Sequence, residues 1–329
     1  MRQQSLWFTR PYDVELREAE LPILGDDEVL VQTAVSAISP GTEMLVYRGQ
    51  WPPELAVDET IEALSGGFAY PLKYGYASVG HVVELGKNVD KVWQDRLVFA
   101  FNPHESYFVA QVELLLPVPE NISPETAVFL PNMETVVSFV MDAQPVIGEE
   151  IVVYGQGIVG LLTTMLLAQF PLSQLVTVDG LALRRDWSQR LGATAVYVPD
   201  APELKDIQAD LALELSGNPA ALDAAIESVG FNGRILVGSW YGQKTVTLNL
   251  GGSFHRNHIQ IISSQVSHLH PRWHGRWDKP RRLQLAWQML AQHDPSQLIT
   301  HRFPLAEAPS AYKLIDEEVE TAVQVVFTY

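Results

Sequence analysis

Three glycines in the stretch IVVYGQGIVGLL are the residues whose spacing most clearly indicates a chemistry. An apolar, strand-like run leads directly into Gly155-x-Gly157-x-x-Gly160 and then into an apolar helical pattern. In such a turn the first glycine allows the tight bend, the second admits a pyrophosphate, and the third lets helix and strand pack closely. The N–H groups that open the helix, at Ile158 and Val159, would bind the anion. The motif predicts a dinucleotide site, and the alternative is a glycine-rich turn without a ligand.

A carboxylate follows the second strand of this region. LVTVDG ends in Asp179, about twenty residues after the glycines, where an acid accepts hydrogen bonds from the adenosine ribose. Because a carboxylate repels a 2′-phosphate, Asp179 favours NAD over NADP. Arg184 lies nearby and keeps NADP open as the alternative cofactor. Four further cofactor-binding candidates stand at later strand ends, where such sheets bind ligands: Ser216, Gly217, Val237 and Gly238.

The elements that must position these residues form two regions with different secondary-structure patterns. Residues 1–125 read as short strands separated by turns, and this β-rich domain is expected to be completed by residues 267–329. From Ser123 helix-start signals appear, and strands then alternate with helices over residues 126–266. We therefore expect an α/β protein in which a doubly wound parallel sheet is inserted into a discontinuous β-rich domain.

Composition excludes several classes of function. The 329-residue chain has a formal charge of −17, which argues against nucleic acid as a partner. It contains no cysteine, so disulfides, thiol nucleophiles and thiolate zinc sites are excluded. No apolar run reaches the roughly 18 residues of a membrane span, and the N-terminus lacks a signal-peptide pattern. We expect a cytoplasmic protein with a small-molecule substrate.

Over essentially its whole length the chain resembles a medium-chain dehydrogenase/reductase of the zinc-type alcohol dehydrogenase-like superfamily. The segments that carry the resemblance are SPGTEMLVYRG, YGYASVGHVVELG, VVYGQGIVG through VDGLALRRDWSQRLGA, and LITHRFPLAEAPSAYKLI. The resemblance implies a GroES-like catalytic domain, a Rossmann domain, NAD(P)-dependent oxidoreductase activity and a homodimer or homotetramer. GSFHRNHIQIISSQVSH is most similar to the branch of bacteriochlorophyllide a dehydrogenase.

The family's zinc-binding pattern is not kept in this sequence. Pro40 stands where the first motif has cysteine, and Tyr76-Ala77 stand where the second has histidine and glutamate. Near the third position, in FLPNMET, only Asn132 and Glu134 carry donor atoms. Catalytic zinc normally needs three protein ligands. We therefore expect a zinc-less member of the family, with no metal and with Asn132 as a substrate-binding candidate.

Without zinc, a side-chain donor must polarise the substrate oxygen. Thr42 matches the family's proton-relay hydroxyl, and Tyr76 occupies the position of the lost histidine, so both are catalytic candidates. Alternatively, Thr42 is only a turn residue and Tyr76 is a bulky side chain that only fills space. Glu43 matches an acid that supports the metal, and without a metal we expect it to pair with an arginine. Tyr47 is expected to have a structural or substrate-binding role.

A histidine-, arginine- and tryptophan-rich segment follows the last predicted strand of the sheet. Its histidines are His255, His258, His268, His270 and His274, and its basic residues are Arg256, Arg272, Arg276, Lys279, Arg281 and Arg282. Because no acidic ligand lies among the histidines, we do not expect a metal site. The cations with Trp273 and Trp277 would suit a large, aromatic, anionic substrate, and we name Arg256 and Trp273 as binding candidates. The alternative is a loop that pairs with acids of the other domain or another subunit.

Three functions remain open at this point. The leading hypothesis is a zinc-independent, NAD(P)(H)-dependent oxidoreductase that transfers hydride to or from a secondary alcohol or ketone, including one on a bulky ring such as a chlorin. The second is reduction of a carbon–carbon double bond in a quinone or enone. The third is a family member that binds nucleotide without catalysis.

Overall fold

The computed structural model describes residues 2–52 and 67–329, and the chain forms two compact units. The β-rich unit comprises Met1–Pro131 and Trp287–Tyr329, and the α/β unit comprises Asn132–Ala286. The sequence placed the corresponding limits at residues 125 and 266, so the difference concerns mainly the segment 267–286. This segment belongs to the α/β unit because Trp273 and Arg282 hydrogen-bond to side chains of a helix in that unit.

The α/β unit contains a six-stranded parallel sheet in the order β10-β9-β8-β11-β12-β13. Its strands are β8 (Glu150–Tyr154), β9 (Gln174–Val178), β10 (Ala195–Tyr197), β11 (Ala209–Glu214), β12 (Val229–Val237) and β13 (Gln260–Ser263). Its helices are α3 (Leu130–Ala143), α4 (Ile158–Leu167), α5 (Ala182–Arg190) and α6 (Pro219–Ser228), and α7 (Lys279–His293) runs on into the other unit.

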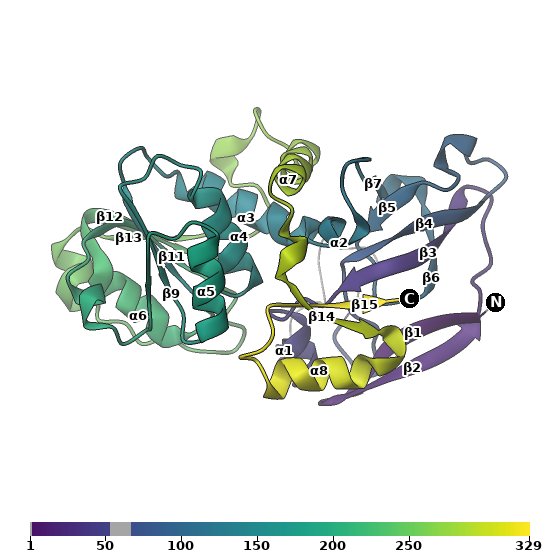
Figure 1. Cartoon of the computed structure of the whole chain (residues 1–329), viewed down its shortest axis with the longest axis horizontal. Helices are drawn as coiled ribbons and strands as arrows, with labels where there is room; N and C mark the ends of the chain where they lie inside the picture. Colours follow the sequence, from purple (N-terminus) through teal and green to yellow (C-terminus); the bar gives the residue numbers. More distant parts are fainter. Residues whose placement is uncertain (1, 53–66) are drawn as a thin grey trace. The chain divides into compact units, whose positions relative to one another are not determined.

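Both faces of this sheet are covered, as its nearly continuous apolar strands require. Along β8, Ile151 and Val153 pack with α3 and α4, whereas Val152 and Tyr154 pack with α6. The alternation follows from the two-residue period of a strand. Figure 1 shows α6 on one side of the sheet and α3, α4 and α5 on the other. The expected doubly wound arrangement, and with it the α/β fold class, is confirmed.

The β-rich unit is built on a mainly antiparallel sheet in the order β14-β15-β3-β4-β5-β7, with β6 also paired to β3. Its strands are β3 (Glu28–Ala37), β4 (Ser78–Leu85), β5 (Leu97–Ala100), β6 (Tyr107–Gln111), β7 (Leu116–Pro117), β14 (Ile299–Pro304) and β15 (Gln324–Thr328). A separate hairpin joins β1 (Arg2–Arg10) to β2 (Asp13–Glu20). The helices are α1 (Glu43–Tyr47), α2 (Pro124–Ala127) and α8 (Ala308–Glu317), and α8 lies beside the hairpin in Figure 1.

Two apolar clusters hold the β-rich unit together. One lies under α1 and α8 and contains Phe8, Tyr47 and Tyr312, and the other is formed by valines of β3, β4 and β5. Local signals start α2 as the sequence predicted, because the Ser123 hydroxyl accepts the Thr126 N–H at 3.1 Å and a proline opens the helix. Because β3 pairs with β4 in this sheet, the loop between β3 and α1 lies next to the segment that leads into β4.

A search of the described residues for helices of membrane-spanning length and apolarity finds none.

Candidate active site

The glycine turn of the α/β unit has the geometry that a pyrophosphate needs. Gly155 has a φ of +90°, and a Cβ there would lie 2.6 Å from the Ser216 backbone. A Cβ on Gly160 would lie 1.9 Å from the Gly155 carbonyl oxygen, so helix and strand could not pack as they do. At Gly157, which caps α4, a Cβ would meet only the Arg184 guanidinium, at 3.9 Å. The turn therefore leaves open space at the position where a cofactor phosphate must approach the backbone.

The first residues of α4 are Ile158 and Val159. The first N–H groups of a helix have no acceptor within that helix, and they carry its positive dipole end. Together with the open backbone at Gly157 they fit the phosphates of a dinucleotide. The residues present therefore fit NAD(P), and we propose that this turn holds its pyrophosphate.

Asp179 lies directly after β9, beside this turn. One carboxylate oxygen accepts the Gln156 N–H at 2.7 Å, and the other accepts the Leu181 N–H at 2.8 Å. Each oxygen keeps a second lone pair that a ribose hydroxyl can use. Arg184 lies near Gly157 with its Nε buried and without a hydrogen-bond partner in residues 2–52 and 67–329. Asp179 and Arg184 thus stand at the turn, while Arg185 donates to the Asp179 carbonyl at 2.9 Å.

The four other cofactor candidates occupy the ends of two neighbouring strands. Ser216 and Gly217 follow β11, and Val237 and Gly238 end and follow β12. The two loops touch, because the Gly217 N–H donates to the Ser239 hydroxyl at 2.8 Å. These positions lie at the carboxyl edge of the sheet, where doubly wound sheets bind ligands.

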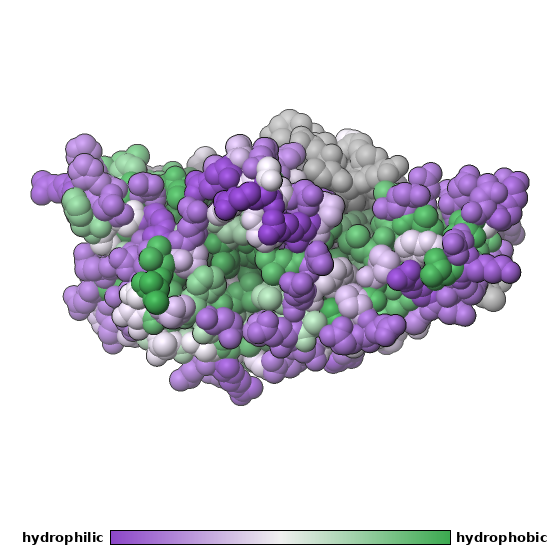
Figure 2. Space-filling view, turned by 90° about the horizontal axis from the view of Figure 1, so that it is seen from above, coloured by the Kyte–Doolittle hydropathy of each residue, from purple (hydrophilic) through white to green (hydrophobic). Residues whose placement is uncertain are grey.

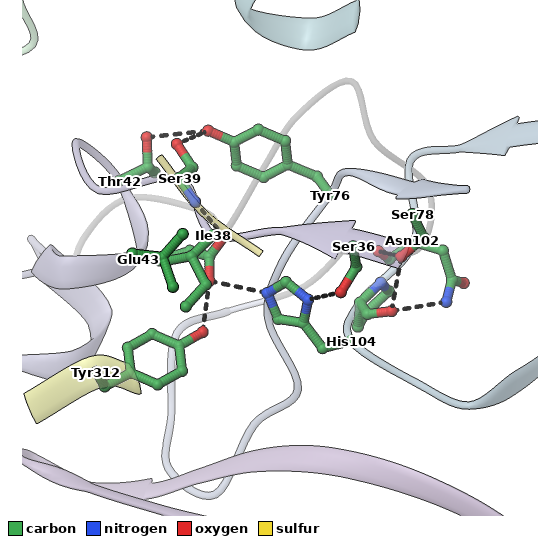
Figure 3. A network of polar contacts seen from close by, with 12 residues as sticks. Ser36, Ile38, Ser39, Thr42, Glu43, Tyr76, Ser78, Asn102, His104 and Tyr312 are labelled. Carbon is green, nitrogen blue, oxygen red and sulfur yellow. Dashed lines mark hydrogen bonds and ion pairs between the residues drawn. The ribbon is translucent and has the colours of Figure 1, made fainter. Parts of the chain in front are cut away.

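Three hydroxyl groups meet in the β-rich unit, at the start of α1. The Tyr76 hydroxyl donates to Ser39 Oγ through a short hydrogen bond and lies 3.3 Å from Thr42 Oγ1 (Figure 3). Tyr76 enters from the segment before β4, whereas Ser39 and Thr42 come from the loop before α1. All three are half-buried. The two sequence candidates for proton transfer, Thr42 and Tyr76, are therefore in contact, and Ser39 joins them.

A fully buried polar network lies behind these hydroxyls. Glu43 Oε2 accepts hydrogen bonds from His104 Nε2 at 3.0 Å and from the Tyr312 hydroxyl at 2.6 Å, and Oε1 accepts the Ser39 N–H at 2.8 Å. Figure 3 shows His104 and Tyr312 reaching the same carboxylate. The expected pairing of Glu43 with an arginine is wrong, because its partners are the imidazole of His104, the Tyr312 hydroxyl and the Ser39 N–H. No sequence pattern indicates this pairing, since the two residues are distant in the chain.

The network continues from His104 to a second tyrosine. Ser36 Oγ lies 2.6 Å from His104 Nδ1 and 2.7 Å from the Tyr329 hydroxyl. Each of these polar atoms therefore has a partner: the Tyr329 hydroxyl pairs with Ser36, Ser36 pairs with Nδ1, and Nε2 pairs with Glu43. Burial, together with the nearby charge of Glu43, raises the pKa of Tyr312 well above its usual value. Burial likewise raises the pKa of Tyr329.

The donor atoms at this place do not fit zinc. Zinc sites use Cys, His, Asp or Glu ligands, whereas the exposed side of this cluster offers the hydroxyls of Ser39, Thr42 and Tyr76. Both oxygens of Glu43 and both nitrogens of His104 already have partners. Across residues 2–52 and 67–329, no group of three or more such ligands is close enough to hold a metal ion. The groups that can act on a substrate proton at this place are therefore hydroxyls.

The structure also places the remaining candidates. Tyr47 is 7% exposed and stacks on Tyr312 at a centroid distance of 5.4 Å, which leaves it little surface for a ligand. Asn132 is half-buried near the start of α3. Sequence reasoning missed Ser39, His104 and Tyr312. The only sequence signal for His104 was its place after a proline, in the polar stretch NPHES between two apolar runs.

Contacts to α3 explain how the arginine- and tryptophan-rich segment is held. Arg282, which is 1% exposed, donates to Glu134 at 2.7 Å and to the Ser138 hydroxyl at 3.0 Å. Trp273 Nε1 donates to Asp142 at 3.0 Å. The expectation that Arg282 contributes to a basic surface is wrong, because its charge is paired inside the unit.

The other basic residues of the segment, including Arg256, are exposed, and Figure 2 shows strongly hydrophilic side chains over the part that precedes α7. Arg276 and Arg281 lie over the rings of Trp273 and Trp277, at 5.3 and 4.1 Å. In the described part of the chain neither guanidinium forms an ion pair. This surface can therefore attract anions.

Comparison with known proteins agrees with this architecture. The family model for zinc-binding dehydrogenases matches residues 159–279. The chain is 24% identical to D-guloside 3-dehydrogenase of Escherichia coli K12 over 99% of its own length and 100% of the relative's. It is 25% identical to L-threonine 3-dehydrogenase of Caldanaerobacter subterraneus over 92% of both chains.

Solved structures share the fold. An alcohol dehydrogenase from Escherichia coli CFT073, solved in complex with NADH, superposes with a TM-score of 0.80 at 17% identity and covers 100% of this chain and 99% of its own. The full-length relatives, the family match and the glycine turn are mutually consistent. The chain is an NAD(P)-dependent dehydrogenase, and it is similar over nearly its whole length to proteins of the medium-chain dehydrogenase superfamily, to which zinc-binding dehydrogenases belong.

Proposed function

We propose that the protein is an alcohol or polyol dehydrogenase that interconverts a secondary alcohol and a ketone without zinc, using the hydroxyls of Tyr76 and Thr42 to handle the proton. The observation that carries the proposal is the contact of these two hydroxyls. The resemblance to zinc-type dehydrogenases supports it, because it aligns Tyr76 with a metal-binding histidine of that family. The relatives support the substrate class, since their names specify oxidation at position 3 of a guloside and of threonine. In threonine that carbon bears a secondary hydroxyl.

The division of labour follows from the chemistry. When bound, NAD(P) supplies the hydride acceptor or donor. The α/β unit's task is to hold it: Gly157 and the start of α4 bind the pyrophosphate, and Asp179 binds the adenosine ribose. The β-rich unit handles the remaining proton. With bound NAD(P) available to accept the carbinol hydride, the substrate O–H proton would pass to the hydroxyl oxygen of Tyr76 or Thr42 while that hydroxyl releases its own proton, through Ser39 in the case of Tyr76, to solvent water. The relay would leave the three hydroxyls unchanged and a carbonyl on the substrate.

The arrangement can stabilise a developing negative charge on the substrate oxygen. The Tyr76 hydroxyl donates to Ser39 Oγ, and the Ser39 N–H is fixed by Glu43, so the donors left for a substrate oxygen are the hydroxyl hydrogens of Ser39 and Thr42, both held in place by their contact with Tyr76. Preorganised donors of this kind lower a barrier because they do not have to reorient during the reaction. The favoured cofactor in this proposal is NAD, because the Asp179 carboxylate follows β9 beside the glycine turn, where it could accept ribose hydroxyls and would repel a 2′-phosphate.

The size and charge of the substrate are a further part of the proposal. Arg276 and Arg281 support an acidic substituent, because their stacked guanidiniums keep in-plane N–H groups that suit carboxylate or phosphate. A chlorin-like ring, suggested by the resemblance to bacteriochlorophyllide a dehydrogenase, stays a prediction. We also propose a homodimer, which the exposed edge strand β13 supports.

The test is a panel of secondary alcohols carrying deuterium at the carbinol carbon, incubated with NAD+ after dialysis against a chelator. The proposal expects deuterated NADH, a ketone product and no gain of rate on adding zinc. Loss of activity on chelation with recovery by zinc would contradict the zinc-free mechanism. Exclusive reduction of enones by deuterated NADH, with label at the carbon β to the carbonyl, would indicate the double-bond reductase. Cofactor binding without turnover across both panels would indicate a non-catalytic protein.

A further inference from the structure

Glu214 is a fully buried acid that the cofactor motif does not include. It is the last residue of β11 and has no exposed surface. One carboxylate oxygen accepts the Ser216 N–H at 2.8 Å and the Ser216 hydroxyl at 2.5 Å, and the other accepts the Tyr241 hydroxyl at 2.6 Å. No ion pair to Glu214 occurs within residues 2–52 and 67–329. Hydrogen bonds from neutral donors therefore stabilise this carboxylate.

These hydrogen bonds join two loops that follow neighbouring strands. Ser216 belongs to the loop after β11, and Tyr241 belongs to the loop after β12. The Glu214 carbonyl oxygen also accepts the N–H groups of Gly238 at 3.0 Å and Ser239 at 3.2 Å. The loops are further linked by the Gly217 N–H, which donates to Ser239 Oγ. One residue thus fixes the relative position of both loops.

The strand order places these loops opposite the adenosine side of the cofactor site. The glycine turn follows β8, and Asp179 follows β9 on one side of it. β11 and β12 lie on the other side of β8. A dinucleotide whose pyrophosphate lies at the glycine turn and whose adenosine ribose contacts Asp179 must extend its second half over the carboxyl ends of β11 and β12.

We propose that Glu214 is a positioning residue for the nicotinamide half of the cofactor. It acts through the loops that it holds, Ser216–Gly217 and Gly238–Tyr241, and does not itself touch the reacting atoms. Burial gives the carboxylate few alternative partners, so the loops keep one arrangement when the cofactor is absent. Preformed loops spare the cofactor the cost of ordering them on binding. The inference rests on NAD(P) binding at the glycine turn and is independent of which side chain handles the substrate proton.

Glu214→Gln is the direct test. The amide keeps the shape of the side chain but offers one acceptor oxygen instead of two, so either Ser216 or Tyr241 loses its acceptor. Fluorescence and calorimetric titrations then compare NADH with ADP-ribose, which lacks the nicotinamide. We expect affinity for NADH to fall about tenfold, the scale of one lost charge-assisted hydrogen bond, and affinity for ADP-ribose to change less than about twofold.

Two other variants keep the proposal falsifiable. Tyr241→Phe removes one hydrogen-bond donor to the Glu214 carboxylate without changing its charge. It should likewise weaken NADH binding more than ADP-ribose binding, and it tests the proposal even if Glu214→Gln fails to fold. Glu203→Gln, a matched change at an exposed position, should bind both ligands like the unchanged protein. Equal weakening of both ligands, or no weakening of NADH, would overturn the proposal. Failure of the unchanged protein to bind ADP-ribose would instead refute the cofactor site itself.

Discussion

Removing the hydroxyl of Tyr76 tests the proposed chemistry most directly. Tyr76→Phe deletes the oxygen that donates to Ser39 and lies 3.3 Å from Thr42 Oγ1. The ring should keep its edge-to-face contact with Tyr74, whose centroid lies 6.2 Å away at an interplanar angle of 82°. The substitution therefore changes the proton chemistry while leaving the packing in place.

Two magnitudes separate a catalytic role from a structural one. Loss of the hydrogen bonds should cost about 1 kcal/mol of unfolding free energy, whatever the role of Tyr76. If the hydroxyl transfers or holds the substrate proton, kcat should fall by about 10²–10⁴, which corresponds to about 2.7–5.4 kcal/mol of activation free energy. Because Thr42 remains as a second hydroxyl, we expect a value near the lower end of that range.

The assay is the steady-state rate of alcohol oxidation with protiated and deuterated substrates, together with the thermal unfolding midpoint. Tyr70→Phe is the matched control, because it removes a tyrosine hydroxyl from the same unit, where it donates to the Val46 carbonyl. The control should lose similar stability and keep its kcat. If kcat of Tyr76→Phe stays within about threefold of the unchanged enzyme, Tyr76 has only a packing role, and the proposal that its hydroxyl handles the substrate proton is refuted.

Further predictions concern the cofactor, the buried acid and pH. Asp179→Gly should weaken NADH binding by about tenfold or more but NADPH binding much less, measured by fluorescence titration, and equal losses would contradict the preference for NAD. Glu43→Gln should lower stability by about 3–5 kcal/mol in denaturant titrations, because it disrupts a buried pair, and a loss below about 1 kcal/mol would contradict the assigned network. Burial is the largest single influence on the pKa of Glu149 and raises it, but the hydrogen bonds from Arg234 and from the Val146 N–H, together with the Arg234 charge, hold that pKa below its usual value. A carboxylate whose pKa is lowered by folding stabilises the protein at pH values above its unfolded pKa, and this stabilisation is lost as the pH falls. The stability difference between the unchanged protein and Arg234→Gln should therefore be about 2 kcal/mol near pH 7 and shrink below about pH 4.5. A difference that grows as the pH falls would contradict this assignment.

The features that sequence predicted well depend on local backbone requirements. Gly155 and Gly160 have steric roles that no other residue can fill, so their spacing after an apolar run predicts the turn that the structure shows. The alternation of strands and helices likewise predicted the parallel sheet. Ser123 predicted the start of α2 because a capping hydroxyl acts within three residues.

The buried network could not be predicted in this way. Ser36 and Glu43 lie seven residues apart, but His104 and Tyr312 come from distant parts of the chain. The pairing of β6 with β3 and the packing of α8 bring them together. The sequence-based domain boundary also placed the segment 267–286 in the other unit. Its assignment depends on hydrogen bonds to polar side chains of α3. Each of these features depends on tertiary contacts.

The buried Glu43 accounts for how the hydroxyl cluster at the start of α1 is held. A buried carboxylate without a partner would be strongly destabilising. In this chain His104, Tyr312 and the Ser39 N–H all donate to Glu43, so the charge is satisfied inside the β-rich unit. Ser39 then faces Tyr76 with its hydroxyl, and its backbone is fixed by the same carboxylate. Glu43 therefore orients the hydroxyl cluster through Ser39.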